Sequence, residues 1–276
     1  MHRLLAVAAL ALVVAPFALS AVGSAQVSSN WSGYVVGAPQ GAAPLSFTDA
    51  TGTWRVPKIT CTRAGTSAAF WVGIGGSSDT SPALEQLGSS ADCSTNKVAT
   101  YRAWTEIVPA PARFLSMKVQ PGDVLNAALL IQGQTVVMSL TNLTRGTRFS
   151  TRMTPAQPLD LTSAEWIAEA PSLCRNATTC QVVPLSKFGS VGFTKIAATA
   201  NGHTGVLTDP AWAVTPVVLA TSAGASRYTA SSNAAGAVPN PIAAGGGSFT
   251  VSYRASLNQA VPARPLAGAP LPDFVR

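Results

Sequence analysis

Two glutamates, Glu165 and Glu169, lie four positions apart in the largely apolar stretch 163–171. In a β-strand successive side chains point to opposite faces, so both carboxyl groups would share one face with Ile167. Glutamate is a poor strand former and is rarely buried without a partner. Carboxyl groups on one face could perform acid–base hydrolysis. A half-exposed strand whose acids simply face water is the simpler interpretation, and this stretch alone leaves both open.

The sequence gives little indication of a Ser-His-Asp triad or of a nucleotide-binding loop. His2 lies in the expected export segment, so a mature chain would keep only His203. A Ser-His-Asp triad would need His203 as its base, yet this residue lies in a turn-like stretch, and the GxSxG motif is absent. The glycines at 73–76 match neither GxGxxG nor a phosphate loop. Carboxylate chemistry remains.

Five short motifs occur in an order that resembles the eqolisin family of glutamic peptidases. They are SNWSG (29–33), FWVGIGG (70–76), ALEQLG (83–88), AWTE (103–106) and AEWIAE (164–169). The resemblance covers roughly residues 29–253. In that family the second glutamate of the last motif is catalytic, which corresponds to Glu169, and the glutamine of the third motif corresponds to Gln86. These two residues lie 83 positions apart, an interval like the family's.

The resemblance implies a mechanism for peptide hydrolysis in acid. Glu169 would act as general base and take a proton from the attacking water. Gln86 would orient that water and stabilise the oxyanion, the kind of contribution worth roughly 10²–10³ in rate. A carboxyl group with an ordinary pKa of about 4.3 changes state near pH 4, so activity should fade toward neutrality.

The resemblance also implies substrate-binding roles for Trp71, Trp31 and Glu106. Plain structural roles for these residues remain open. One departure concerns Gly75, because the family usually has Asp after Trp-Val-Gly-Ile. This glycine removes a carboxylate from the expected rim of the site and leaves the substrate preference and pH profile open.

The N-terminus resembles an export signal. Arg3 precedes an apolar run, and small residues at 23–25 form a cleavage site, so we expect a signal peptide over 1–25 and a secreted protein. Pro16 and Ser20 interrupt the run before it reaches the ~20 residues of a spanning helix, so no membrane association is expected after cleavage. Residues 26–256 would form one domain, and the Pro-rich tail 257–276 is expected to be disordered.

The formal net charge of +7 does not indicate nucleic-acid binding, because Lys and Arg are scattered singly along the chain. We expect polypeptide substrates and a monomer. Four cysteines in an exported chain predict two disulfides. Cys174 and Cys180 would close a local loop, as the family's corresponding pair does, which leaves Cys61 to join Cys93. Neither a metal nor another cofactor is expected, since the cysteine spacing does not suit zinc.

Short segments with alternating side chains, separated by Gly, Pro and Asn turns, predict an all-β protein. The expected strands include 47–55, 68–74, 83–87, 97–107, 124–132, 135–142, 163–170 and 191–200. Residues 223–247 are predicted to be a long surface loop. The resemblance specifies a two-sheet antiparallel β-sandwich of concanavalin-like, jelly-roll type.

Two other function classes fit such a fold. A carbohydrate-active sandwich, either a glycoside hydrolase or a lectin-like module, could use Glu165 with Glu169, or Glu106 with Glu169, as facing carboxylates. A noncatalytic surface-binding module would keep only the scaffold. Acid digestion of a protein substrate would separate the peptidase from both.

Overall fold

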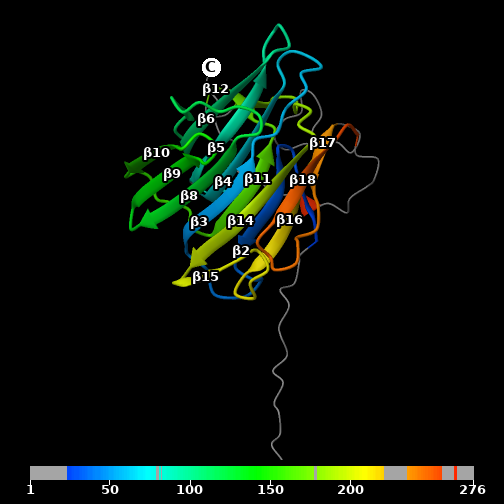
Figure 1. Cartoon of the computed structure of the whole chain (residues 1–276). Coiled ribbons are helices and arrows are strands. Elements are labelled where there is room, and N and C mark those ends of the chain that lie inside the picture. The colour runs from blue at the N-terminus through cyan, green and yellow to red at the C-terminus, as the bar shows by residue number, and fades with distance from the viewer. Residues whose placement is uncertain are drawn as a thin grey trace, which may run out of the picture.

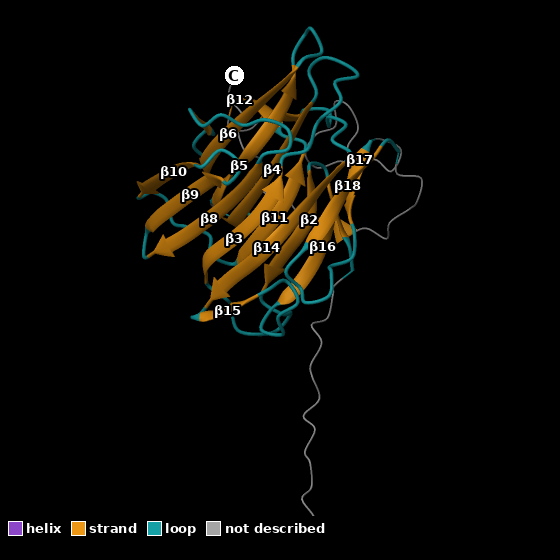
Figure 2. Cartoon of the chain, viewed as in Figure 1, coloured by secondary structure: helices purple, strands orange, loops and turns teal. Residues whose placement is uncertain are grey.

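The computed structural model describes residues 24–78, 81, 83–176, 179–220, 235–256 and 264–265; for residues 174–176, 179–180 and 264–265 it describes the backbone only. The described part consists of strands and loops without a helix, so no helix in it could cross a membrane (Figure 2). The expected signal peptide falls almost wholly outside these residues. The strands are β1 (Gln26–Ser28), β2 (Trp31–Gly37), β3 (Phe47–Arg55), β4 (Ser67–Gly75), β5 (Leu84–Cys93), β6 (Ala99–Val108), β7 (Arg113–Leu115), β8 (Val124–Gln132), β9 (Thr135–Asn142), β10 (Thr147–Met153), β11 (Ser163–Glu169), β12 (Ser172–Asn176), β13 (Thr179–Val182), β14 (Ser190–Ala200), β15 (His203–Gly205), β16 (Ala213–Ala220), β17 (Gly236–Pro239), β18 (Phe249–Arg254) and β19 (Arg264–Pro265).

The strands form two antiparallel layers, as predicted (Figure 1). The first layer has the order β10–β9–β8–β3–β14–β18, and the second has the order β7–β6–β5–β4–β11–β2–β16. Strand β17 pairs with both β16 and β18 and thereby joins the layers at one edge. Strand β1 runs parallel to β16 and to β19.

A large apolar core fills the space between the layers. Alternation places Phe70, Val72 and Ile74 of β4 in this core, together with Trp166 of β11. Two indole N–H groups cross the sandwich. Trp166 donates to the carbonyl oxygen of Thr51 at 2.8 Å, and Trp54 donates to the hydroxyl of Ser89 at 3.1 Å. These bonds fix the layers relative to one another and satisfy the buried indole N–H groups of both residues.

The predicted strand 83–87 is longer in the structure, where β5 runs to Cys93 because it pairs along its whole length with β6. The prediction that 223–247 is a loop was wrong in part, because residues 236–239 form β17. Pairing on both sides overrides the weak strand propensity of a Gly- and Ala-rich segment. Arg264–Pro265, in the predicted tail, pair with Gln26–Val27.

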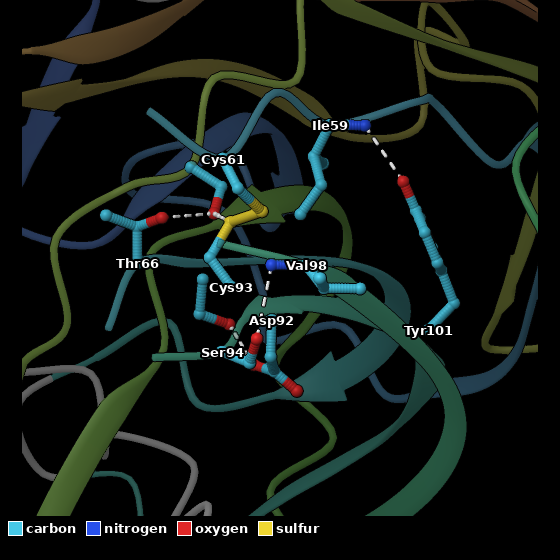
Figure 3. The surroundings of a disulfide bond; sticks show 10 residues. Ile59, Cys61, Thr66, Asp92, Cys93, Ser94, Val98 and Tyr101 are labelled. Carbon is cyan, nitrogen blue, oxygen red and sulfur yellow. Dashed lines mark hydrogen bonds between the residues drawn. A yellow bond between two sulfur atoms is a disulfide. The ribbon is translucent and has the colours of Figure 1, made fainter. Parts of the chain in front are cut away.

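The disulfide between Cys61 and Cys93 ties the loop before β4 to the end of β5, with the two Cα atoms 5.5 Å apart (Figure 3). Beside it, the backbone N–H of Ile59 donates to the Tyr101 hydroxyl at 2.9 Å. Cys174 and Cys180 lie opposite one another in the β12–β13 pairing. The side chains of that pair are outside the described part of the chain, so the second disulfide stays a prediction.

Candidate active site

The outer face of the second layer, which points away from the main core, carries the predicted site residues. Directly paired residues in neighbouring strands project to the same face, so the pairing register identifies three adjacent rows of side chains. In strand order β2, β11, β4, β5, β6, the rows are Val35–Glu165–Gly73–Gln86–Glu106, Gly33–Ile167–Trp71–Gly88–Trp104, and Trp31–Glu169–Ala69–Ser90–Arg102.

Glu165 and Glu169 therefore share a face, as the alternation predicts. The interpretation of a half-exposed strand was wrong, because every residue of β11 is buried and both glutamates are fully inaccessible. Ile167, Trp31, Trp71 and Trp104 form a second apolar cluster around them. The carboxyl groups are thus buried on the same face as these aromatic side chains.

Glu169 is held by two neutral donors. The Asn30 side-chain amide donates to Oε1 at 2.9 Å, and the Trp71 indole N–H donates to Oε2 at 2.7 Å. Burial raises the pKa of Glu169 to about 8, while Trp71, Asn30 and Trp31 lower it in part. The indole N–H of Trp31 makes no hydrogen bond among the described residues, and its ring packs edge-on against Trp71 with centroids 5.0 Å apart.

Gln86 is oriented by a different carboxyl group. Its side-chain amide nitrogen donates to Glu106 Oε2 at 2.7 Å, and both residues are buried. The amide oxygen of Gln86 has no hydrogen-bond partner among the described residues. A primary amide carries two N–H groups, so one donor and the oxygen remain for a ligand or a water molecule.

Gln86 and Glu169 lie on a diagonal across β4, with Trp71 between them. Their rows are separated by four residues along the strands, and their strands by one intervening strand. In a flat sheet their Cα atoms would be about 17 Å apart. Glu165 lies in the same row as Gln86, separated from it only by Gly73, which has no side chain. The sheet therefore presents two buried glutamates to Gln86, one directly across and one diagonal.

We compared the chain with models of known protein families. The model of the Peptidase A4 family matches residues 29–241, which is most of the chain. The chain belongs to the Peptidase A4 family.

Solved structures agree on the fold of this Peptidase A4 member. It is similar to scytalido-glutamic peptidase bound to a transition-state analogue inhibitor, with 24% sequence identity and a TM-score of 0.64. It is also similar to SCP-B, a member of the eqolisin family of peptidases in complex with the tripeptide Ala-Ile-His, with 23% identity and a TM-score of 0.60. Each alignment covers 82% of this chain and 98% of the other. Among curated proteins no significant match was found.

Among the residues that the structure describes in this Peptidase A4 chain, none donates to Glu165 as Asn30 and Trp71 donate to Glu169. Burial raises its pKa well above the ordinary value, the neighbouring Ser163 hydroxyl lowers it, and the charges of Asp160 and Glu85 raise it further. Glu165 therefore holds its proton more firmly than an ordinary glutamate. A protonated carboxyl can donate a hydrogen bond but cannot act as a base.

Asn30 is the functional candidate that the sequence interpretation missed, although it lies within the first motif. It also belongs to an Asn-Trp-Ser sequon, but its side chain is buried and bonded to Glu169. Asn142, in a second sequon, is fully buried and donates to Asp123. Neither asparagine is accessible for a glycan in the folded Peptidase A4 domain.

Asp160 lies directly against Gly75, where the family usually has an aspartate. A Cβ atom at position 75 would lie 2.3 Å from the Asp160 carbonyl oxygen, and the φ of +83° also favours glycine there. Asp160 accepts hydrogen bonds from the backbone N–H of Gly76 and from the hydroxyls of Ser81 and Thr162. Burial raises the pKa of Asp160 and these donors outweigh that effect, so its pKa lies below the ordinary value.

His203 lies on β15 in the Peptidase A4 chain, with 54% of its side chain exposed, and pairs with Asp209 at 3.0 Å. This is a surface position outside the site-bearing rows. Within the described ranges no three His, Cys, Asp or Glu side chains gather where they could hold a metal ion.

Proposed function

We propose that this Peptidase A4 member, a glutamic endopeptidase, is a secreted acid enzyme in which Glu169 and Gln86 act on one water molecule. The observation that carries the proposal is the contrast between the carboxyl groups of Glu169 and Glu106. Glu169 is held by two donors that stabilise its ionised form, whereas Glu106 is committed to orienting Gln86. Glu169 can thus release and take up a proton, and Glu106 fixes the neutral amide of Gln86 on the same face of the sheet.

In the proposed reaction, ionised Glu169 removes a proton from the water as its oxygen attacks the scissile carbonyl carbon. The free N–H of Gln86 donates to the carbonyl oxygen as it becomes an oxyanion. The tetrahedral intermediate then collapses, the C–N bond breaks, and protonated Glu169 returns the proton to the leaving amine. Because the two side chains lie on a diagonal, both must lean along their strands toward Trp71 to reach one water.

The protonation state of Glu169 depends on how deeply its carboxyl group is buried. With its pKa at about 8, Glu169 holds a proton throughout acid and neutral pH and is not yet a base. Water that enters with a substrate would relieve the desolvation that raises this pKa, while Trp71 and Asn30 would continue to lower it. We therefore expect Glu169 to become a base only when the site is open to water.

Trp31, Trp71 and Trp104 would bind the substrate chain through their apolar surfaces, as aromatic side chains commonly do. The tripeptide in the complex of the similar SCP-B supports a polypeptide as the ligand of this chain. The export signal expected over 1–25 would place the enzyme outside the cell, and we expect it to act as a monomer through the domain 26–256.

The test is digestion of casein at pH 3.5 in the presence of pepstatin by the wild-type chain and by Glu169→Gln and Glu165→Gln. The second variant is a matched control, because both glutamates are buried on the same face of β11. We expect at least a 10³-fold loss for Glu169→Gln and a much smaller loss for Glu165→Gln. The reverse order would assign the base to Glu165. Sugar release from a polysaccharide panel without proteolysis would instead support a carbohydrate-active enzyme.

A further inference from the structure

The row of side chains that contains Glu169 ends in an arginine. It runs across the strands from Glu169 through Ala69 and Ser90 to Arg102 of β6. At ordinary strand spacing the Cα atoms of Glu169 and Arg102 are about 14 Å apart. Ala69 and Ser90, which lie between them, have small side chains. A substrate chain that crosses the strands from Glu169 would therefore reach Arg102 after about four residues.

Arg102 is held in place by two neighbours. Its Nη2 donates to Asp92 Oδ2 at 2.5 Å, and its guanidinium carbon lies 3.8 Å from the centroid of the Phe114 ring. Asp92 is fixed in turn, because the Ser67 hydroxyl donates to its Oδ1 at 2.6 Å and because the disulfide at the next residue anchors the end of β5 (Figure 3). The Arg102 side chain is still 37% exposed, so a ligand can reach it from solvent.

Two hydrogen-bond donors at this end of the row lack a partner within the described part of the chain. They are Nε of Arg102 and the hydroxyl of Ser90, both buried atoms, and Ser90 as a whole is 2% exposed. Ser90 and Arg102 are directly opposite one another in the β5–β6 pairing, so both donors belong to the same face. A buried donor without a partner is costly, and a guanidinium N–H can only donate. The two groups therefore call for an acceptor.

A carboxylate is the acceptor that fits this pair. It accepts hydrogen bonds at both oxygens, and its charge is opposite to that of the guanidinium group. Asp92 bonds Nη2 rather than Nε. Glu169, in the same row, is bonded to Asn30 and Trp71 instead. The carboxylate would therefore come from the ligand, and a polypeptide carries carboxylates on its acidic side chains and at its C-terminus.

We propose that Arg102 and Ser90 form a subsite that binds a carboxylate of the polypeptide substrate. The carboxylate would accept hydrogen bonds from Nε of Arg102 and from the Ser90 hydroxyl. The peptidase would then prefer an acidic residue, or a chain end, about four residues from the cleaved bond. This preference rests on the proposed function, whereas binding of the carboxylate does not.

Binding is tested by calorimetry at pH 3.5 with the full chain carrying Glu169→Gln, which prevents cleavage. The probes are peptides of one sequence that carry either cysteic acid or glutamine at one position, scanned along the peptide. The sulfonate of cysteic acid stays ionised at this pH, whereas a carboxyl group with a pKa of about 3.9 does not. We expect one position at which cysteic acid lowers Kd about 10- to 100-fold, since hydrogen bonds to charged groups are strong.

Adding Arg102→Gln should abolish this gain in affinity, and Ser90→Ala should reduce it by a smaller factor. Arg102→Lys keeps the charge but loses the Nε donor, so it should retain only part of the gain. Arg148→Gln is the matched control, because it removes the same charge from an exposed position on β10 in the other layer, and it should leave the gain unchanged. Equal affinities at every position, or a gain that persists in Arg102→Gln, would overturn the proposal.

Hydrolysis at pH 5 by the chain with Glu169 intact identifies the source of the carboxylate. The substrates carry glutamate or glutamine at the scanned position, each with a free or an amidated C-terminus. A preference for glutamate in kcat/KM that Arg102→Gln abolishes would assign the subsite to an acidic side chain, and a loss on amidation would assign it to the chain end. If neither carboxylate alters the rate of an active enzyme, the subsite does not guide cleavage. If no peptide is cleaved, the proposed function fails, while calorimetry still decides whether the subsite exists.

Discussion

The indole nitrogen of Trp71 donates a hydrogen bond to Oε2 of Glu169 at 2.7 Å, from a position between that glutamate and Gln86. A hydrogen bond to a carboxylate favours its charged form, so this contact opposes the effect of burial on the pKa of Glu169. Trp71 therefore does more than pack in the second apolar cluster, because its hydrogen bond affects how easily the proposed base loses its proton.

Trp71→Phe keeps the aromatic ring and removes the donor. We expect the pKa of Glu169 to rise and kcat/KM to fall roughly 10- to 100-fold, since hydrogen bonds to charged groups contribute about 1.5–3 kcal/mol. The measurement is the pH profile of kcat/KM, whose acid limb should move to higher pH. Trp212→Phe is the control, because that buried indole donates to the backbone carbonyl oxygens of Val206 and Leu207 and not to a carboxyl group of the described residues. An acid limb that stays in place would show that Trp71 does not tune Glu169.

Glu106→Ala tests whether Glu106 positions Gln86 or binds substrate. Loss of the 2.7 Å hydrogen bond should free the Gln86 amide to rotate, so we expect kcat to fall about tenfold or more with a smaller change in KM. Glu106→Gln keeps an acceptor for Gln86 and should recover most of kcat. A rise in KM at constant kcat would instead support the substrate-binding role implied by the family resemblance.

Stability should depend on pH through buried carboxyl groups. Burial raises the pKa of Glu85 to about 8, with the charge of Asp160 adding to the effect, and that of Glu169 to about 8. Between pH 4.5 and 8 the folded chain holds protons that the unfolded chain has released. The free energy of unfolding therefore falls as pH rises, by up to roughly 1.4 kcal/mol per pH unit for each group. Below this window the sign reverses, because Asp123 and Asp160 have lowered pKa values and lose stabilising contacts when protonated.

Urea unfolding at pH 4.5 and at pH 7.5 measures this dependence, and we expect greater stability at pH 4.5. Glu85→Gln, which removes one of these buried carboxyl groups, should flatten the slope of stability against pH by the contribution of one group. Greater stability at pH 7.5 would show that these carboxyl groups are ionised in the folded protein.

Gly88→Ala should destabilise the site-bearing sheet. An added Cβ would lie 2.2 Å from the carbonyl oxygen of Phe70 and 2.7 Å from Cβ of Trp71, so the β4–β5 pair would have to separate. We expect a loss of roughly 2–3 kcal/mol in the free energy of unfolding by urea titration. Gly192→Ala in β14 is the matched control, because the nearest atom there is 3.7 Å away. Equal effects of the two substitutions would show that close approach at Gly88 is unimportant.

The local parts of this architecture could be predicted from sequence. Alternation alone places Glu165 and Glu169 on one face, and turn residues delimit strands such as β3 and β8. The partners of those glutamates could not be predicted, because they depend on the register between strands far apart in the chain. Asn30 reaches Glu169 over 139 positions, and Gln86 meets Glu106 only because β5 and β6 pair in one particular register. Strand β17 was missed for a similar reason, since its two neighbours rather than its own composition make it a strand.

A double-mutant cycle with Glu169→Gln, Gln86→Ala and the combined variant, measured as kcat/KM for one peptide at pH 3.5, tests the central claim most directly. Groups that act on the same water are expected to be strongly non-additive, so the combined variant should be no slower than the slower single variant within about threefold. Losses that multiply would show that Glu169 and Gln86 act independently and would contradict the shared-water mechanism.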